Sequence, residues 1–385
     1  MNHQHPPAPP RIAVVGGSLT GPMAALLLLR AGFDHVAVYD AAPGGAPRHG
    51  GLIGLADPAL DVLDRLGIGQ EEFVAFGSQY AVQMSVRERA VTGTLAQVYP
   101  GRHTTWTLLH HALATRLPRH VIHSGRRVTG IGEAGDGPVL RFTRGRRRGF
   151  DVVVFADGRA STGRRLLDPG RRLRYAGYVA HRGTAPLRHG GVREFTSVQP
   201  CPGVLLNLAP VPGPGIDWSL YLNTTADQYA SWFGARPDER LFVLPEHVSA
   251  LAYAHVDANA DTWLPAAQAN LVHATAARTA VPVMDIDPPR RMVWPVGAGF
   301  AVLVGDALAP VRPHTARGLN NGIEQVADLV AVLRQHRRYG ADLAAGLDGW
   351  QRRHLPVVHA DLALGPRIAG RLGLGARPDR IVELV

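Results

Sequence analysis

A glycine-rich turn between an apolar strand and a helix constrains the fold more than any other feature. Residues 12–15 are apolar, the turn GGSLTG occupies residues 16–21, and residues 22–31 have helical spacing. A second apolar strand at residues 36–39 ends in Asp40. Two strands joined by a helix of this length predict a parallel, right-handed βαβ unit. In that setting the turn suits a dinucleotide pyrophosphate, and Asp40 suits its ribose.

Composition narrows the class of protein. The chain has 385 residues, of which 46% are hydrophobic and 19% charged, as in globular proteins with room for two cores. Cys201 is the only cysteine, which excludes an internal disulfide and cysteine-clustered metal sites and is typical of the cytoplasm. The formal charge of +10 comes from arginine without any lysine. We interpret this as codon bias rather than nucleic-acid binding, and the run at residues 144–148 as a solvated turn.

The N-terminal region predicts neither a signal peptide nor a membrane-spanning segment. Residues 1–10 are polar and proline-rich without the features of a signal peptide, so we expect a disordered lead-in. The apolar stretch at residues 23–29 is far shorter than the roughly 20 residues that a membrane span needs. We therefore expect no membrane partner and a cytoplasmic protein.

The pattern of the chain changes near residue 175. Short alternating strands separated by proline and glycine follow, and they predict an antiparallel sheet. A buried strand at residues 300–304 then resumes the first pattern. Helices are expected at residues 227–233, 238–253, 320–335 and 349–364. The fold class is therefore α/β, a Rossmann-type domain interrupted by an antiparallel β-sheet domain and followed by a C-terminal helical segment.

Two further motifs follow apolar strands. The first, DGRAS at residues 157–161, is followed by Arg164. The second is GDALAPVRPH at residues 305–314, followed by a helix that opens at Gly318. The acid of the second motif is suited to a sugar-alcohol chain. The dipole of the following helix is suited to negative charge on a reduced ring.

Taken together, these motifs resemble those of the class A FAD-dependent aromatic hydroxylases, the family typified by para-hydroxybenzoate hydroxylase. Within that family the chain is most similar to the 2,6-dihydroxypyridine 3-hydroxylases. The shared stretches are GGSLTG, YAGYVAHRG at residues 175–183 and GDALAPVRPH. The similarity extends from about residue 11 to about residue 374.

The resemblance implies one non-covalent FAD in a GR2-type Rossmann site. The FAD-binding domain would comprise residues 11–73, 100–174 and 289–345, and the β-sheet substrate domain residues 74–99 and 175–288, with a helical segment at 346–385. The residues expected to bind the cofactor are Gly16, Ser18, Leu19, Thr20, Gly21, Asp40, Asp157, Arg164, Gly305, Asp306, Pro313, Gly318, Leu319 and Asn320. One departure is Trp106, where many relatives have an arginine that contacts FAD.

The resemblance also implies a monooxygenase. NADPH or NADH would reduce the flavin, and dioxygen would form a C4a-hydroperoxide that transfers oxygen to a small electron-rich aromatic, N-heteroaromatic or alkene substrate. Hydroxylation and epoxidation use the same reagent and stay open, and a role in secondary metabolism fits either. The cofactor supplies the difficult chemistry, while the protein positions the substrate and excludes water.

Catalytic candidates are His314, Pro313, His181 and Tyr221. His314 is either a base or a loop histidine bonded to backbone, and His49 is a weaker candidate. Arg182 either binds a substrate carboxylate through two hydrogen bonds or links the two domains. Strand alternation places Tyr221 and Asn223 on one face without telling which face is inside. The residues expected to bind substrate are Tyr178, Gln199, Asn207, Tyr221 and Asn223.

Other classes of protein remain as alternatives. An FAD-dependent oxidase or dehydrogenase would use the same scaffold without inserting oxygen. A flavin-dependent halogenase needs a catalytic lysine, which this chain lacks. A nucleotide- or nucleic-acid-binding protein has no supporting motif. The expected partners are therefore a small-molecule substrate and dioxygen, without nucleic acid or metal, and a homodimer stays open.

Overall fold

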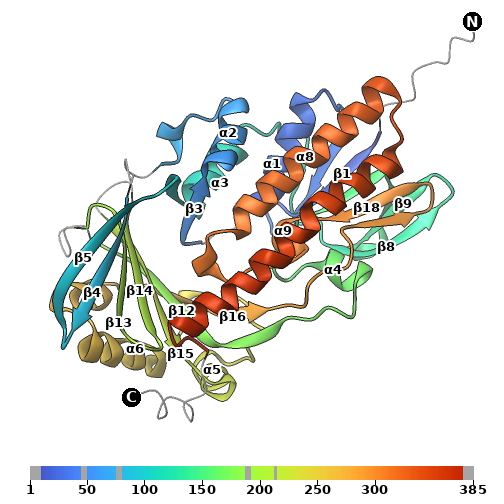
Figure 1. Ribbon diagram of the computed structural model, residues 1–385. Coiled ribbons are helices and arrows are strands. Elements are labelled where there is room, and N and C mark those ends of the chain that lie inside the picture. Colours follow the sequence, from blue (N-terminus) through green and yellow to red (C-terminus); the bar gives the residue numbers. More distant parts are fainter. Residues whose placement is uncertain (1–9, 45–49, 75–79, 187–191, 212–214, 376–385) are drawn as a thin grey trace, which may run out of the picture.

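The structure, a computed structural model, describes residues 10–44, 50–74, 80–186, 192–211 and 215–375. Two large sheets dominate this part of the chain, one at each end of the view in Figure 1. The long C-terminal helices run alongside the first sheet and reach toward the second (Figure 1).

A six-stranded sheet forms the centre of the first domain, in the order β17-β18-β11-β1-β2-β7. Its strands are β1 (Ile12–Val15), β2 (Val36–Tyr39), β7 (Ile122–His123), β11 (Val152–Phe155), β17 (Val293–Val296) and β18 (Gly299–Leu303). α1 (Thr20–Arg30) connects β1 to β2, which pair in parallel. Every residue of β1, β2 and β11 is buried, as in a parallel sheet covered on both faces. The expected βαβ unit is present.

The glycines of the first turn are required by close backbone contacts. Gly16 has φ 115°, a conformation that favours glycine, and a Cβ there would overlap the carbonyl of Ala156. A Cβ on Gly21 would overlap the carbonyl of Gly16. These glycines therefore let β1, β11 and α1 approach one another closely.

Helices and two small sheets surround the six-stranded sheet. α1 packs on α8 (Gly318–Tyr339), and α8 packs on α9 (Leu343–Arg371). The remaining elements are α2 (Asp57–Arg65), α3 (Trp106–Ala114) and α4 (Thr162–Leu167), the pair β3 (Leu52–Ala56) and β6 (Gly101–Thr105), and the three-stranded sheet of β8 (Val128–Ala134), β9 (Gly137–Phe142) and β10 (Arg147–Gly149). α9 is longer than the helix expected at residues 349–364 because it continues through Pro356 and Pro366. Within the described residues, every helix is too short or too polar to cross a membrane.

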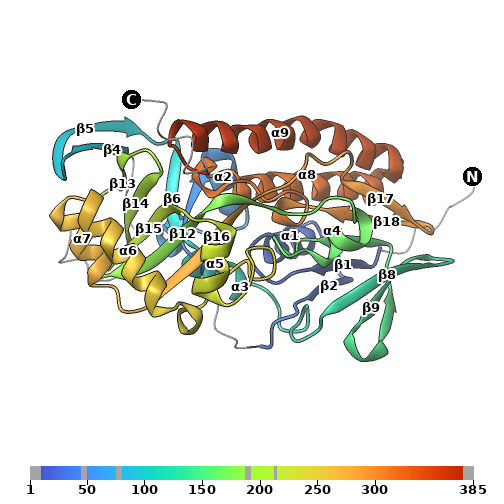
Figure 2. The same cartoon turned by 90° about the horizontal axis from the view of Figure 1, so that it is seen from below.

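A seven-stranded sheet forms the second domain, in the order β16-β12-β15-β14-β13-β4-β5. Its strands are β4 (Tyr80–Arg87), β5 (Ala90–Val98), β12 (Arg174–Ala185), β13 (Phe195–Cys201), β14 (Val204–Val211), β15 (Gly215–Asn223) and β16 (Arg278–Asp285). The pairing is antiparallel except between β13 and β4. α5 (Ala226–Phe233), α6 (Ala250–Trp263) and α7 (Ala266–His273) lie against one side of this sheet (Figure 2).

The helix expected at residues 238–253 is wrong in its position. α6 begins only after Ser249, whose hydroxyl oxygen accepts a hydrogen bond from the Ala252 N–H at 3.2 Å. Pro245 opens a separate 3-10 turn, and Val243 pairs its backbone with Ala280 of β16. The capping serine and the proline divide the stretch that was expected to form one helix.

Candidate active site

A cavity of about 680 Å³ lies between the two domains. This volume is in the range of small-molecule sites, roughly 300–1,000 Å³. A smaller cavity of about 210 Å³ adjoins it, and Ser18, Ala156 and Gly158 line both. An elongated ligand can therefore extend from the edge of the parallel sheet to the face of the seven-stranded sheet.

The glycine turn forms one wall of the large cavity. Ser18, Leu19 and Thr20 line it at the start of α1. No side chain caps this helix, and no acidic residue lies in its first turn. The positive end of the helix is therefore left to a ligand, as pyrophosphate sites require. Gly16 and Asp40 line the smaller cavity, and Asp40 accepts a hydrogen bond from the Ala42 N–H at 3.0 Å.

Asp306 and the start of α8 form a second wall. Asp306 lies in the turn η5 (Gly305–Ala307), and burial raises the pKa of its carboxyl, against the opposing charges of Arg159 and Arg164. Gly318 and Leu319 also line the cavity, and no side chain caps α8. A carboxylate beside an uncapped helix start is suited to a polyol chain and an electron-poor ring.

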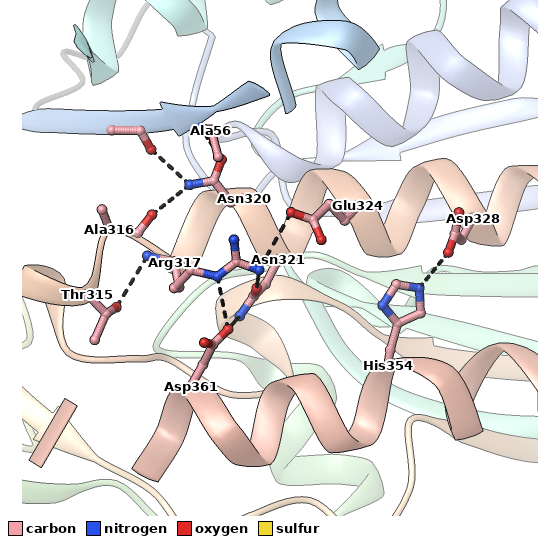
Figure 3. Close-up of polar contacts among 11 residues, drawn as sticks. Ala56, Thr315, Ala316, Arg317, Asn320, Asn321, Glu324, Asp328, His354 and Asp361 are labelled. Atoms are coloured by element: carbon pink, nitrogen blue, oxygen red, sulfur yellow. Dashed lines mark hydrogen bonds and ion pairs between the residues drawn. The ribbon is translucent and has the colours of Figure 1, made fainter. Parts of the chain in front are cut away.

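Asn320 supports this wall from behind. Its amide nitrogen donates hydrogen bonds to the carbonyls of Gly54 at 2.9 Å and Ala316 at 2.6 Å. Its amide oxygen accepts one from the Ala56 N–H at 2.9 Å (Figure 3). The side chain predicted to bind FAD is thus occupied in joining α8 to β3. Gly305 and Gly21 likewise lie behind the walls, where they permit close packing.

The aspartate of the Asp-Gly motif forms hydrogen bonds with the start of α4, the helix that follows it. Asp157 accepts hydrogen bonds from the Ser161 hydroxyl at 2.5 Å and the Thr162 N–H at 2.6 Å, and it lines the smaller cavity. Arg164, predicted to contact FAD, is instead buried and donates to the carbonyls of Asp306, Ala307 and Arg159. The short helix α4 directs it inward, so it joins two motifs rather than lining a cavity.

The register of the sheet identifies its inner face. Arg182 of β12, Ser219 of β15 and Asn207 of β14 stand opposite one another across three strands, and all of them line the cavity together with Tyr221. His181 alternates to the other face, where its ring lies 6.2 Å from that of Phe233. Burial lowers the pKa of His181 to about 3. The predicted catalytic position of His181 is therefore wrong, because neighbouring residues of a strand face opposite sides.

Three other substrate candidates lie outside the cavity wall. Tyr178 is buried behind His314, with ring centres 6.1 Å apart. Asn223 binds the chain after α9, donating to the Gly373 carbonyl at 2.9 Å and accepting from the Gly375 N–H at 2.7 Å. Gln199 is not among the lining residues. These placements differ from the sequence-based expectation because alternation does not fix how far along a strand the cavity extends.

His314 lines the cavity with Pro313 in the turn η6 (Pro313–Thr315). Its Nε2 lies 3.1 Å from the Gly365 carbonyl oxygen, which can only accept, so Nε2 carries the proton. Nδ1 is buried without a hydrogen-bond partner in the described part of the chain, and burial lowers the pKa of the ring. The contact fixes the loop to α9 and fits the loop histidine better than the base. His49 lies outside the described residues.

Several lining residues escaped the sequence reasoning. Trp106 donates from Nε1 to the Ser18 hydroxyl at 3.2 Å, so it holds the glycine turn. His103 stacks between Tyr99 and Phe195, at 4.4 and 4.6 Å between ring centres. This stack packs β6 against β13, and no sequence motif indicates it. Arg159 also lines the cavity, and its place in the Asp-Gly motif was the available signal. Among the described residues, no group of acidic, histidine and cysteine side chains could hold a metal.

Comparison with known proteins supports the family that the sequence motifs suggested. No family model matches the chain. It is 30% identical to the 3-amino-4-hydroxybenzoate 2-monooxygenase of Streptomyces cremeus, over 84% of this chain and 78% of that protein. It is 29% identical to the 6-hydroxynicotinate 3-monooxygenase of Pseudomonas fluorescens, over 88% and 86%.

The fold is that of 2,6-dihydroxypyridine-3-hydroxylase from Arthrobacter nicotinovorans. The TM-score is 0.81 at 24% identity, with 97% of this chain and 96% of that chain covered. The glycine turn, the buried aspartate and the inserted sheet all face one cavity, as FAD-dependent oxygen transfer requires. The chain belongs to the family of FAD-dependent aromatic monooxygenases, with NAD(P)H as the electron donor.

Proposed function

We propose that this enzyme hydroxylates a small, electron-rich, hydroxylated aromatic or N-heteroaromatic ring. The observation that carries the proposal is the cavity itself, whose walls are FAD-type motifs on one side and a polar sheet face on the other. The relatives named above act on 3-amino-4-hydroxybenzoate, 6-hydroxynicotinate and 2,6-dihydroxypyridine, all planar hydroxylated rings. Each is a monooxygenase or hydroxylase, and none is an oxidase.

The residues present fit FAD. Ser18, Leu19 and Thr20 would hold its pyrophosphate with backbone N–H groups, and Asp40 would hold its adenosine ribose. Asp306 would bind the ribityl hydroxyls, while Gly318 and Leu319 would lie against the pyrimidine edge of the ring. When bound, FAD would supply an acceptor for the two electrons of NAD(P)H and a means of activating dioxygen.

The protein itself supplies orientation and a dry site. Phe195, Phe242, Val281 and Val283 present apolar surface to the cavity, which favours a flat ring and excludes water. Burial raises the pKa of Tyr221, against the charge of Arg182, so its hydroxyl keeps its proton. Tyr221 is thus proposed to position the substrate rather than to remove a proton from it.

A direct test supplies candidate rings to the purified enzyme under labelled dioxygen. The proposal expects NAD(P)H consumption that requires the ring, with one labelled oxygen atom in the product. Oxidation of the ring without label would instead favour an FAD-dependent oxidase or dehydrogenase. Hydroxylation and epoxidation add the same mass, so the NMR spectrum of the product distinguishes a hydroxyl group from an epoxide.

We also propose a cytoplasmic homodimer that binds neither nucleic acid nor membrane. The edge strand β5 is exposed at every residue and carries no charged side chain. Val91, Leu95 and Val98 are large apolar residues exposed on it. A strand edge without charged residues can pair with a strand of another chain. A second copy of this chain offers the same edge, so β5 can pair with its counterpart about a twofold axis.

A further inference from the structure

One arginine in the cavity wall has no carboxylate partner. Arg182 lies in the middle of β12, and its guanidinium extends across the cavity toward Gly51 near the start of β3. No ion pair within 4.0 Å joins it to a carboxylate of the described residues. Its Nε is buried without a hydrogen-bond partner among the same residues. The positive charge is therefore left facing the space that a substrate would fill.

Polar groups surround this charge on the same sheet face. Arg182 stands opposite Ser219, which stands opposite Asn207. Tyr221 follows Ser219 by one alternation on β15, and the charge of Arg182 opposes the rise in the pKa of its hydroxyl. Four neighbouring polar side chains thus come from three adjacent strands and line one patch of the cavity. The other nearby lining residues, such as Phe195, Phe242 and Val281, are apolar.

The acid beside this patch, Asp217, makes no ion pair with Arg182 within 4.0 Å in the described part of the chain. Asp217 precedes Ser219 by one alternation on β15, and it stands opposite Thr184 rather than Arg182. It is only 7% exposed and does not line the cavity, and its Oδ1 has no hydrogen-bond partner in the described part of the chain. Burial raises the pKa of Asp217 to about 7, against the opposing charge of Arg182.

We propose that Arg182, with Tyr221, Ser219 and Asn207, forms a subsite for a carboxylate carried by the substrate ring. This inference rests on the proposed function and narrows its substrate class to aromatic acids. A guanidinium presents paired N–H donors in the geometry of a carboxylate, which a hydroxyl or a ring nitrogen does not match. A partly buried charge without a counterion is costly, and a ligand anion removes that cost. Arg182 is therefore a specificity-determining residue.

The test is a titration of the oxidised holoenzyme, followed by the change in flavin absorbance. The probes are three acids and their counterparts without the carboxylate: 6-hydroxynicotinate and 2-hydroxypyridine, 3-amino-4-hydroxybenzoate and 2-aminophenol, salicylate and phenol. We expect at least one acid to bind at least tenfold more tightly than its neutral counterpart. Equal affinities across all three pairs, or no response to any acid, would overturn the inference.

Two substitutions of Arg182 separate charge from shape. Arg182→Gln should weaken binding of the preferred acid at least tenfold while leaving its neutral counterpart within about twofold. Arg182→Lys, which keeps the charge, should retain part of the preference. Arg174→Gln is the matched control, because Arg174 lies on the same strand but is exposed and paired with Asp287. An Arg182→Gln enzyme that keeps the full preference would contradict the role assigned to Arg182.

Flavin content separates this inference from the proposed function. Each variant is checked for one FAD per chain and for its melting temperature before titration. If the wild type holds FAD and oxygenates a ring but does not favour acids, only the carboxylate subsite fails. If the wild type takes up no FAD, the proposed function fails, and this inference fails with it.

Discussion

Two buried histidines make the free energy of unfolding depend on pH. Burial lowers the pKa of His103 to about 4 and of His181 to about 3. In the unfolded chain both would titrate near 6.5. Their neutral form is therefore favoured by folding, and the associated stability is complete above pH 6.5 and is lost as the pH falls.

The contribution of these two histidines to the free energy of unfolding should accordingly decrease on acidification, while the raised pKa of Asp217 acts in the opposite direction over the same range. Each histidine contributes about 2 kcal/mol of loss between pH 6.5 and pH 5, since one pH unit corresponds to about 1.4 kcal/mol. Urea unfolding at the two pH values measures the loss. Between pH 6.5 and pH 5, His181→Leu should lose about 2 kcal/mol less stability than the wild type, because that histidine is buried on the helix-covered face. An unchanged pH dependence in this variant would contradict the role of burial.

Asp306 provides a test of the cofactor site at the same scale. Asp306→Ala removes the carboxylate that lines the cavity beside Arg159. Hydrogen bonds to a charged group contribute about 1.5–3 kcal/mol, so we expect FAD to bind roughly 10- to 100-fold more weakly. Asp348→Asn is the control, since Asp348 is an exposed partner of Arg352. Stoichiometric FAD in purified Asp306→Ala would count against the assignment.

Sequence reasoning identified residue types better than their directions. The glycine turn and Asp306 lie where their motifs suggested, because close packing and strand ends restrict both positions. Arg164 and Asn320 point away from the cavity, since the carbonyls of neighbouring loops offer them partners that no local pattern reveals. Strand alternation grouped Tyr221 with Asn223 correctly, but only tertiary packing decides which face is inside.

At the scale of elements, α9 holds the first turn of α8 in place. Asp361 of α9 accepts hydrogen bonds from Arg317 at 3.2 Å and Asn321 at 2.9 Å (Figure 3). Arg317 immediately precedes Gly318 and Leu319, which line the cavity. The C-terminal helix thus reaches the proposed flavin site through one buried carboxylate.

Asp361→Ala should therefore affect both stability and cofactor retention. Loss of this half-buried pair should cost about 2 kcal/mol, below the roughly 3–5 kcal/mol of a fully buried one, and FAD should dissociate at a lower temperature. The matched control is His354→Leu, which removes the His354–Asp328 contact between the same two helices (Figure 3), and neither of these residues lines the cavity. The control should lower the melting temperature without releasing FAD. Equal flavin loss in both variants would contradict a local role for Asp361.

The position of α6 shows what element-level patterns miss. One helix was expected at residues 238–253, but the serine cap and the 3-10 turn start the helix at Ala250. The βαβ unit was predictable because strand, turn and helix follow one another within the chain. The parallel pairing of β13 with β4 was not, because those strands come from distant segments.

At the scale of the whole molecule, the exposed edge of β5 predicts an assembly. Val98→Glu, which places a charge on the exposed edge strand, should convert a dimer into a monomer in light scattering. Val357→Glu is the control, because Val357 is also an exposed valine but lies on α9 rather than on this edge. A monomeric wild-type protein, or a dimer that survives Val98→Glu, would exclude pairing through β5.

The account as a whole depends on one flavin enclosed by distant parts of the chain. The turn after β1, the turn after β18 and the start of α8 line one cavity under the seven-stranded sheet. The most direct measurement is the ratio of FAD to polypeptide after incubation with excess FAD and gel filtration. The account predicts a yellow protein with one FAD per chain. A colourless protein that takes up no FAD would contradict it.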